Sequence, residues 1–198
     1  MWSFWPILSF SITSGDLFAK TVTPIQEGVA YASDGSVSQT NDLSNPNAWF
    51  PSAPQKKVAT PVTTYTLSIP KLKIQDATVT IAGDDLDTSL VHYGGTALPG
   101  DYGNTVIFGH STLPQFYNPK NYKTIFSFLP SLKDGDEIDI AYDGISYKYV
   151  VYDMNVSEPS DLSALAQRFD DSYVTLITCV PPGTWWQRLH VFAKLSRS

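Results

Sequence analysis

Apolar and polar residues alternate along most of the chain after Tyr65. Tyr65, Leu67 and Ile69 are separated by Thr and Ser, and the segment 77–81 repeats this spacing. A period of two gives a β-strand one apolar face and one solvated face. Further strand-like runs lie at 90–93, 104–110, 137–142, 145–152, 173–179 and 188–194.

Turn residues separate these runs at short intervals. Asp143-Gly144 joins two of them and is among the strongest short-range signals for a hairpin. The segment 181–183, Pro-Pro-Gly, separates the last two runs. Seven or eight short strands with turns at this spacing predict an all-β domain. A closed barrel is favoured, although periodicity alone does not separate a barrel from a sandwich.

Two stretches depart from the alternation and predict short helices. Pro130 is the expected end of the first because it cannot continue the hydrogen-bond ladder, and Ser160 is the expected cap of the second. The residues expected to face inward are Ile125, Phe128 and Leu129 in the first and Leu162, Leu165 and Ala166 in the second.

The first 61 residues lack the strand pattern. Met1–Ile12 is apolar, but it is shorter than the roughly 20 residues that span a bilayer, and no Lys or Arg precedes it as in a signal peptide. We interpret it as part of a truncated membrane anchor. The alternative is an apolar terminus without an anchoring role. Residues 13–61 are polar and rich in Pro, which predicts a flexible linker. The expected division is an N-terminal stretch with a linker at 1–61 and a β-domain at 62–198.

Charge and cysteine content narrow the possible functions. The net charge of −6 and pI of about 4.8 argue against a nucleic-acid partner, since phosphate binding requires clustered Lys and Arg. The single cysteine excludes an internal disulfide. In an exported protein an unpaired thiol is liable to oxidation, so its presence suggests a use.

That cysteine, Cys179, ends one strand-like run, and Arg188 begins the next. A guanidinium near a thiol favours the thiolate, which attacks carbonyl carbon. A lone cysteine among apolar residues is more often a buried filler. His110 strengthens the catalytic interpretation, because it follows a hydrophobic strand at the start of a loop, and a cysteine with a sequence-distant histidine is a candidate nucleophile pair.

Four motifs follow one another between Tyr65 and Leu195. They are Gly-Thr-Ala-Leu-Pro-Gly at 95–100, Gly-Asn-Thr-Val-Ile-Phe-Gly-His-Ser at 103–111, Thr-Leu-Ile-Thr-Cys at 175–179 and Arg-Leu-His-Val-Phe-Ala-Lys-Leu at 188–195. In this order they resemble the sortases, the surface-protein transpeptidases of bacteria. One departure is His190, where the family usually has an aliphatic residue.

The resemblance implies a sortase-type closed β-barrel and a cysteine transpeptidase that cuts a Leu-Pro-x-Thr-Gly-like sorting signal after the threonine. It implies that Cys179 forms a thioester with the threonine carbonyl and that His110 serves as general acid and then as general base. Arg188 would hold the substrate and stabilise the oxyanion. Thr178 either shapes the substrate-binding site through its hydroxyl or is simply a good strand residue.

Three histidines compete for the acid–base role. We choose His110, at the family's own position and at a strand end, where the ring has freedom. His92 is expected to fill or cap the following glycine-rich turn. His190 shares a strand face with Arg188 about 7 Å further along, and is expected to be a hydrogen-bonded wall residue.

Two further segments carry alternative interpretations. Trp49-Phe50 interrupts the predicted linker and either packs on the outside of the barrel or forms a lid over the active site, as in some pilin-type sortases. Some sortases bind calcium through loop carboxylates, but Gly83–Asp87 does not match an EF-hand loop and is better explained as a solvated turn. We therefore expect no metal and no cofactor.

The expected partners follow from the resemblance: a sorting-signal peptide and an amine acceptor on the cell wall or on a pilin. We expect an extracytoplasmic location with a membrane tether at the N-terminus. The short segment between Cys179 and Arg188 suggests a class D- or E-like enzyme. The chain has no Leu-Pro-x-Thr-Gly of its own, so it is expected to be the enzyme. A hydrolytic cysteine protease and a non-catalytic surface-binding module remain the alternatives.

Overall fold

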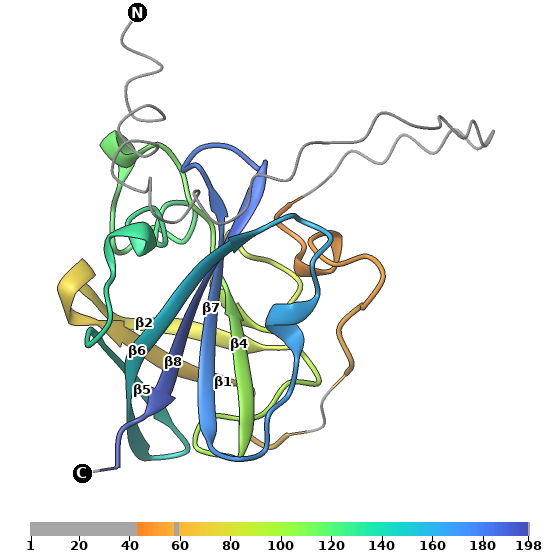
Figure 1. Cartoon of the computed structure of the whole chain (residues 1–198), viewed down its shortest axis with the longest axis vertical. Coiled ribbons are helices and arrows are strands. Elements are labelled where there is room, and N and C mark those ends of the chain that lie inside the picture. Colours follow the sequence, from red (N-terminus) through yellow and green to blue (C-terminus); the bar gives the residue numbers. More distant parts are fainter. Residues whose placement is uncertain (1–42, 58–59, 198) are drawn as a thin grey trace, which may run out of the picture.

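Eight strands close into a barrel in the order β1-β2-β3-β4-β7-β8-β6-β5 (Figure 1). The structure, a computed structural model, describes residues 43–57 and 60–197. The closed barrel confirms the predicted all-β fold and excludes a sandwich. The strands are β1 (Thr64–Ile69), β2 (Ile74–Ile81), β3 (Leu90–His92), β4 (Gly103–Phe108), β5 (Glu137–Tyr142), β6 (Ile145–Ser157), β7 (Ser172–Val180) and β8 (Gln187–Leu195).

The order of the strands brings distant parts of the chain together. β4 runs parallel to β7, with Phe108 opposite Ile177 at the end of the ladder. β7 and β8 are antiparallel neighbours joined by a short loop. The residues that follow β4 therefore lie beside the end of β7 and the start of β8, and this is the end of the barrel that the sequence motifs share.

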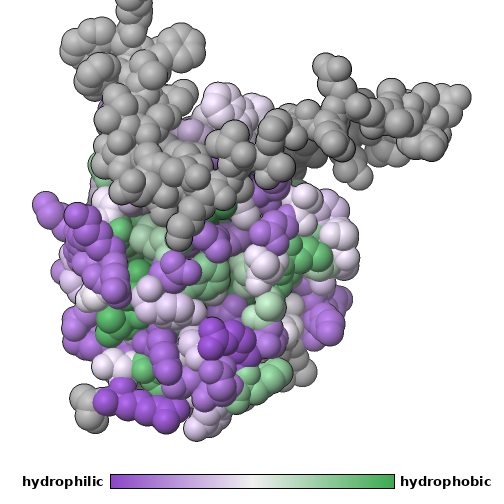
Figure 2. Space-filling view, in the orientation of Figure 1, coloured by the Kyte–Doolittle hydropathy of each residue, from purple (hydrophilic) through white to green (hydrophobic). Residues whose placement is uncertain are grey.

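The barrel interior is filled by the alternating apolar residues of all eight strands. Leu67, Ile69 and Val79 are fully buried in this core, and β7 is buried on both faces along its whole length. Covering on both faces explains why the sequence of β7 lacks a simple alternation. On the face shown in Figure 2, hydrophilic and hydrophobic side chains are intermixed.

A second apolar cluster lies outside the barrel, and we call it the outer cluster. It contains Trp49 and Phe50, each about 1% exposed, packed on Phe108 and Ile177. The segment 43–57, which belongs to the predicted linker, is therefore folded against β4 and β7. This confirms that the two aromatics pack on the outside of the barrel.

The two predicted helices are wrong: both are short 3-10 turns. They are η4 (Leu129–Ser131) and η5 (Ser163–Leu165). Pro130 lies inside η4 rather than after it, and a proline can neither donate nor extend the ladder. No side chain caps η5, whose N-cap is Leu162 rather than Ser160. Further 3-10 turns are η1 (Pro46–Ala48), η2 (Pro70–Leu72) and η3 (Pro114–Phe116).

No helix within residues 43–57 and 60–197 has the length and hydropathy required to cross a membrane. The predicted anchor, Met1–Ile12, lies outside the described residues.

Candidate active site

Cys179 and Arg188 are direct cross-strand partners at the end of the β7–β8 ladder. Directly opposed residues project on the same face of a sheet, with Cβ atoms about 5 Å apart. The pairing therefore places the thiol and the guanidinium next to each other. Both side chains are almost completely buried, with Cys179 5% and Arg188 3% exposed.

His110 is held beside the end of β7 by hydrogen bonds on both sides of it. The Gly109 amide donates to the Ile177 carbonyl (3.2 Å), and the Thr178 hydroxyl donates to the Gly109 carbonyl (2.8 Å). On the other side, the Ser111 hydroxyl donates to the Cys179 carbonyl (2.5 Å). These bonds extend the parallel pairing of β4 and β7 beyond Phe108, and they bring His110 alongside Cys179.

The glycine before His110 is required by packing. A Cβ atom at Gly109 would lie 2.5 Å from the Phe126 ring and 2.6 Å from the Leu90 side chain. Both neighbours are fully buried in the barrel core, so they cannot move aside cheaply. The backbone can pass this point only as glycine, and the imidazole follows directly.

The Cys179 thiol is buried beside a cation, and burial and the positive charge have opposite effects on its pKa. Burial raises the pKa of Cys179, because a thiolate is poorly solvated in the outer cluster, and the Arg188 charge lowers it. Burial is the larger effect, so the resting side chain is mostly a thiol at neutral pH. Formation of the reactive thiolate therefore depends on nearby positive charge.

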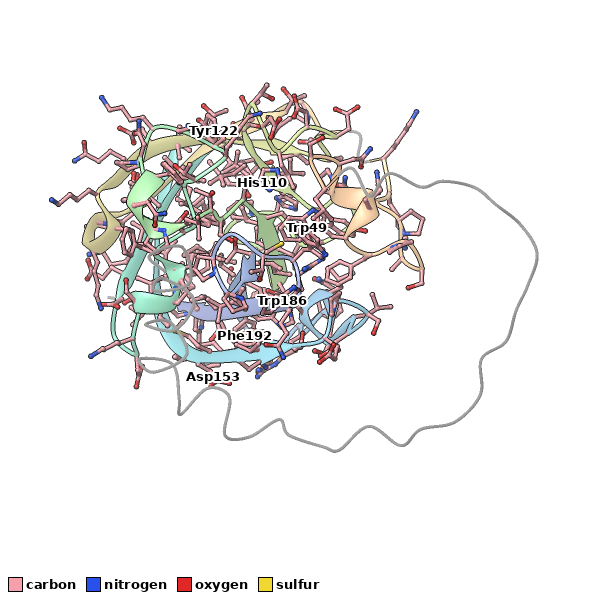
Figure 3. The ribbon with its side chains drawn as sticks, turned by 90° about the horizontal axis from the view of Figure 1, so that it is seen from above. Trp49, His110, Tyr122, Asp153, Trp186 and Phe192 are labelled. Atoms are coloured by element: carbon pink, nitrogen blue, oxygen red, sulfur yellow. The ribbon has the colours of Figure 1, made fainter. Side chains whose placement is uncertain are left out.

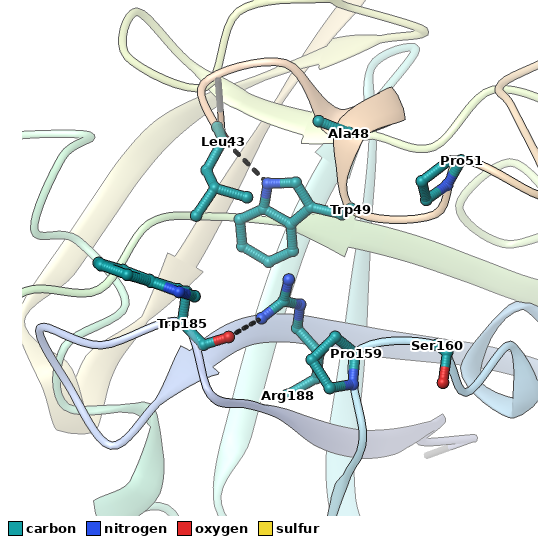
Figure 4. Close-up of a pocket in the computed structure, with 8 residues that line it drawn as sticks. All are labelled: Leu43, Ala48, Trp49, Pro51, Pro159, Ser160, Trp185 and Arg188. Atoms are coloured by element: carbon teal, nitrogen blue, oxygen red, sulfur yellow. Dashed lines mark hydrogen bonds between the residues drawn. The ribbon is translucent and has the colours of Figure 1, made fainter. Parts of the chain in front are cut away.

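The Arg188 guanidinium is clamped between the β7–β8 loop and Trp49 (Figure 4). One terminal nitrogen, Nη1, donates to the carbonyls of Trp185 (3.2 Å) and Gln187 (3.3 Å). The Trp49 ring lies over the guanidinium at 4.8 Å, a cation–π distance. The Nε atom is buried and has no hydrogen-bond partner within the described chain. Arg188 is thus fixed in orientation with an unused donor.

A pocket of about 610 Å³ opens beside Arg188 (Figure 4). It is lined by Leu43, Ala48, Trp49, Pro51, Pro159, Ser160, Trp185 and Arg188. Trp185 is exposed on its rim. A mostly apolar pocket with one charged donor is typical of a site that binds a largely apolar ligand and orients one of its polar groups.

Trp49 contacts two of the three candidate residues. Its ring centroid is 6.1 Å from that of His110, and its indole nitrogen donates to the Leu43 carbonyl (2.8 Å). Seen from above (Figure 3), Trp49 and His110 lie near each other at this end of the barrel. The segment that carries Trp49 therefore packs on the outside of the barrel next to the candidate site. In this position the Trp49 ring also covers Arg188.

The remaining sequence-predicted residues are enclosed. Thr178 is fully buried, does not line the pocket beside Arg188, and contacts the site through the Gly109 carbonyl. His92 contacts Tyr65 and Thr96, each at 3.0 Å. Burial lowers the pKa of His92 to about 4.

His190 lies two residues beyond Arg188 on the same face of β8, and it is fully buried. Its Nε2 is 3.4 Å from the Ser157 hydroxyl, and its Nδ1 has no partner within the described chain. Burial, with a smaller effect of the Arg188 charge, lowers the pKa of His190 to about 4, against an opposing effect of Asp161. A buried neutral ring fits the expected wall residue.

The sequence alone does not single out Ser111 or Asp87 at this site, and it leaves Trp49 with two interpretations. Ser111 bonds the Cys179 carbonyl, Trp49 covers Arg188, and Asp87 lies 3.5 Å from the His110 ring. Ser111 could have been noticed because it adjoins His110; Asp87 and Trp49 become neighbours only through the fold. Within residues 43–57 and 60–197, no group of three or more His, Cys, Asp or Glu side chains is arranged to hold a metal ion.

Residues 67–196 match the family model of the sortase domain. Similar solved structures include a Clostridium perfringens sortase D5 transpeptidase, with 26% identity, a TM-score of 0.58 and coverage of 71% of this chain and 83% of that chain. A lid mutant of sortase A from Corynebacterium diphtheriae has 32% identity and a TM-score of 0.60, with coverage of 71% of this chain and 73% of that chain. Sortase C-1 from Actinomyces oris has 30% identity and a TM-score of 0.59, with coverage of 70% of this chain and 76% of that chain. No curated protein sequence matches the chain.

Proposed function

The chain belongs to the sortase family, and on that basis we propose that it is a cysteine transpeptidase that cleaves a Leu-Pro-x-Thr-Gly-like sorting signal and transfers the acyl group to an amine. The observation that carries this proposal is the cross-strand pairing of Cys179 with Arg188 beside His110. A nucleophile, a proton-transfer group and a fixed cation at one end of the barrel are the groups that acyl transfer requires.

In the reactive form of the proposed enzyme, Cys179 is a thiolate and His110 is protonated; the thiolate attacks the threonine carbonyl and forms a tetrahedral intermediate. His110 donates a proton to the departing amine, the C–N bond breaks, and a thioester remains. An incoming amine then gives its proton to His110 as it attacks the thioester, and the thiolate leaves. His110 gives up one proton in the first half-reaction and takes up one in the second, so the enzyme returns to its starting state.

Arg188 is assigned to the developing oxyanion and to substrate binding. Support comes from its fixed orientation and from the donor at Nε that has no partner within the described chain. A donor held in place before the reaction stabilises the new charge without reorganisation. The same guanidinium opposes the effect of burial on Cys179, which favours the reactive thiolate.

Thr178 is assigned a positioning role. Its hydroxyl holds the Gly109 carbonyl at 2.8 Å, next to His110. In this role it shapes the site from within, rather than by touching the substrate.

The finer assignments rest on the family. Only a short loop joins β7 to β8, which favours a class D- or E-like enzyme. We assign it an extracytoplasmic location with an N-terminal membrane tether, sorting-signal peptides as substrates, and a cell-wall or pilin amine as acceptor. Cofactors play no part in the proposed steps.

Incubation with a library of sorting peptides, with and without amine acceptors, tests the proposal by mass spectrometry. The wild type should give a peptide–amine product, Cys179→Ala and His110→Ala should give none, and His190→Val should keep most of the activity. Circular dichroism should show all variants folded, since removing the buried sulfur costs only about 1 kcal/mol.

Each other outcome selects an alternative. Hydrolysis that an added amine cannot divert indicates a cysteine protease. An absence of cleavage, with a thiol that resists iodoacetamide at every pH, indicates a binding module. An active His110→Ala with an inactive His190→Val would overturn the choice of histidine.

A further inference from the structure

The acidic turn that precedes β3 reaches the candidate active site. Asp87 places Oδ1 at 3.5 Å from Nε2 of His110 and Oδ2 at 2.7 Å from Nζ of Lys123. Its side chain is about one-third exposed, and that of His110 is 17% exposed. The turn that sequence analysis interpreted as solvated therefore has one carboxylate facing the proposed acid–base residue.

The backbone holds Asp87 in this position. Leu86, its neighbour, is fully buried in the outer cluster, and its amide donates to the Ser44 carbonyl (2.8 Å). The amide of Asp87 itself donates to Oδ1 of Asp85 (2.8 Å). An apolar anchor and two hydrogen bonds thus fix the turn, so the direction of the carboxylate is set by the fold.

Lys123 approaches from the other side, on the loop that follows His110. The Phe126 amide on this loop donates to the His110 carbonyl (3.0 Å), which ties the loop to the site. The hydrogen bond and charge of Asp87 raise the pKa of Lys123, with a smaller contribution from Asp85. Lys123 therefore stays charged. One carboxylate oxygen of Asp87 contacts Lys123, and the other contacts the His110 ring.

We propose that Asp87 is a positioning residue for His110, which it orients through Nε2 and stabilises as the imidazolium, while Lys123 holds the carboxylate in place. The role of His110 in catalysis rests on the proposed function; the contact between Asp87 and His110 does not. Contact through Nε2 assigns proton exchange with the amines to Nδ1. A carboxylate this close to an imidazole favours the charged form and one orientation of the ring.

Other charged groups at this end act on His110 less directly. Asp85 acts on Lys123 through its charge, and Arg188, which contacts the same Trp49 ring as His110, disfavours added positive charge on His110. A Cys179 thiolate would favour the imidazolium. Variants of Asp87 and Lys123 leave these groups in place, so their effects report on the Asp87 contact.

Titration of the His110 ring by NMR in the full chain tests the proposal, with His110→Ala used to assign the signal. Asp87→Asn removes a negative charge and should move the titration midpoint of His110 to lower pH. Lys123→Met frees the carboxylate from its cation and should move the midpoint the opposite way. Asp84→Asn is the matched control, because it makes the same charge change on an exposed residue of the same turn and should have no effect.

Kinetics give a second measurement. Asp87→Asn should lower kcat about two- to fivefold, as expected for loss of a partly exposed ion pair, with KM nearly unchanged, and Asp87→Glu should recover part of the loss. A midpoint that Asp87→Asn and Lys123→Met leave in place overturns the proposal. Shifted midpoints in a protein without transpeptidase activity support the Asp87 contact and overturn only the proposed function.

Discussion

Arg188 combines a fixed charge with a fixed orientation, and these two properties can be separated. Its contacts with the Trp185 carbonyl and the Trp49 ring hold the planar group at one angle. Lysine keeps the charge but offers a single flexible ammonium, so it cannot reproduce a donor held in a fixed orientation.

Arg188→Lys is therefore expected to lower the rate of peptide cleavage about 10²–10³-fold, the usual cost of one oxyanion donor. The pH midpoint of Cys179 alkylation by iodoacetamide should change little, because the charge is kept. Arg188→Met should raise that midpoint, since the guanidinium lowers the pKa of Cys179. Near wild-type cleavage by the lysine variant would contradict the role of Arg188 as an oriented donor.

The residues of the candidate site differ in how visible they are in the sequence. Cys179, His110 and Arg188 stand in motifs at strand ends, so local pattern and residue chemistry suffice to select them. Asp87 belongs to an acidic turn that looks solvated by itself. Its contact with His110 depends on the burial of Leu86 against a distant segment, and no local pattern encodes that proximity.

At the scale of elements, the segment 43–57 is the part that sequence patterning placed least well. Its polar composition is that of a linker, yet Trp49 and Phe50 are buried against β4 and β7. Two large apolar side chains supply enough buried area to fix a short segment whose remaining residues are solvated. The strands, in contrast, were predictable within a few residues because their alternation is local.

Trp49→Ala should raise the rate of peptide cleavage a few-fold, because the indole no longer covers Arg188 and the adjoining pocket, while the Trp185 and Gln187 carbonyls still hold the guanidinium. The same change should lower the free energy of unfolding by about 3–5 kcal/mol, as for a buried tryptophan. Peptide kinetics and urea denaturation measure the two effects.

Phe50→Ala is the matched control, because it removes a buried ring of the same segment that packs on Tyr93 and Phe108. It should cost stability without the same gain in rate. Equal gains in both variants would mean that general loosening of the segment, and not uncovering of Arg188, controls access.

At the scale of the whole molecule, two buried neutral histidines make stability depend on pH. Burial lowers the pKa of both His92 and His190 to about 4, against about 6.5 in the unfolded chain. Between these values the unfolded state binds more protons, so stability is fully present above about pH 6.5 and is lost as the pH falls toward 4. Each histidine contributes up to about 3 kcal/mol to this loss.

Thermal unfolding at pH 7 and at pH 4.5 measures the effect. The wild type should lose stability at the lower pH, and His190→Val should lose less of it. An equal loss in both proteins would show that His190 does not set the acid response, which would then rest on His92 and the carboxylates.

The closed barrel was predictable from the number and spacing of the strands, but the order of its strands was not. Periodicity identifies a strand without naming its neighbours, and the parallel pairing of β4 with β7 joins segments about 70 residues apart. The two predicted helices failed because a short apolar stretch with a helical spacing is also compatible with a 3-10 turn. In this chain Pro130 and the lack of a cap decide for the turn.

That parallel ladder also determines when the protein can become active. Two strands, β5 and β6, lie between β4 and β7 in the chain, so a large loop must close before His110 meets Cys179. Until then the thiol lacks the buried surroundings of the folded barrel and has no imidazole beside it, although the local β7–β8 hairpin can already place Arg188 opposite it. In the proposed mechanism, assembly of the site and burial of its sulfur are therefore the same event, and a chain delayed on the way to the closed barrel has an exposed thiol without its histidine partner.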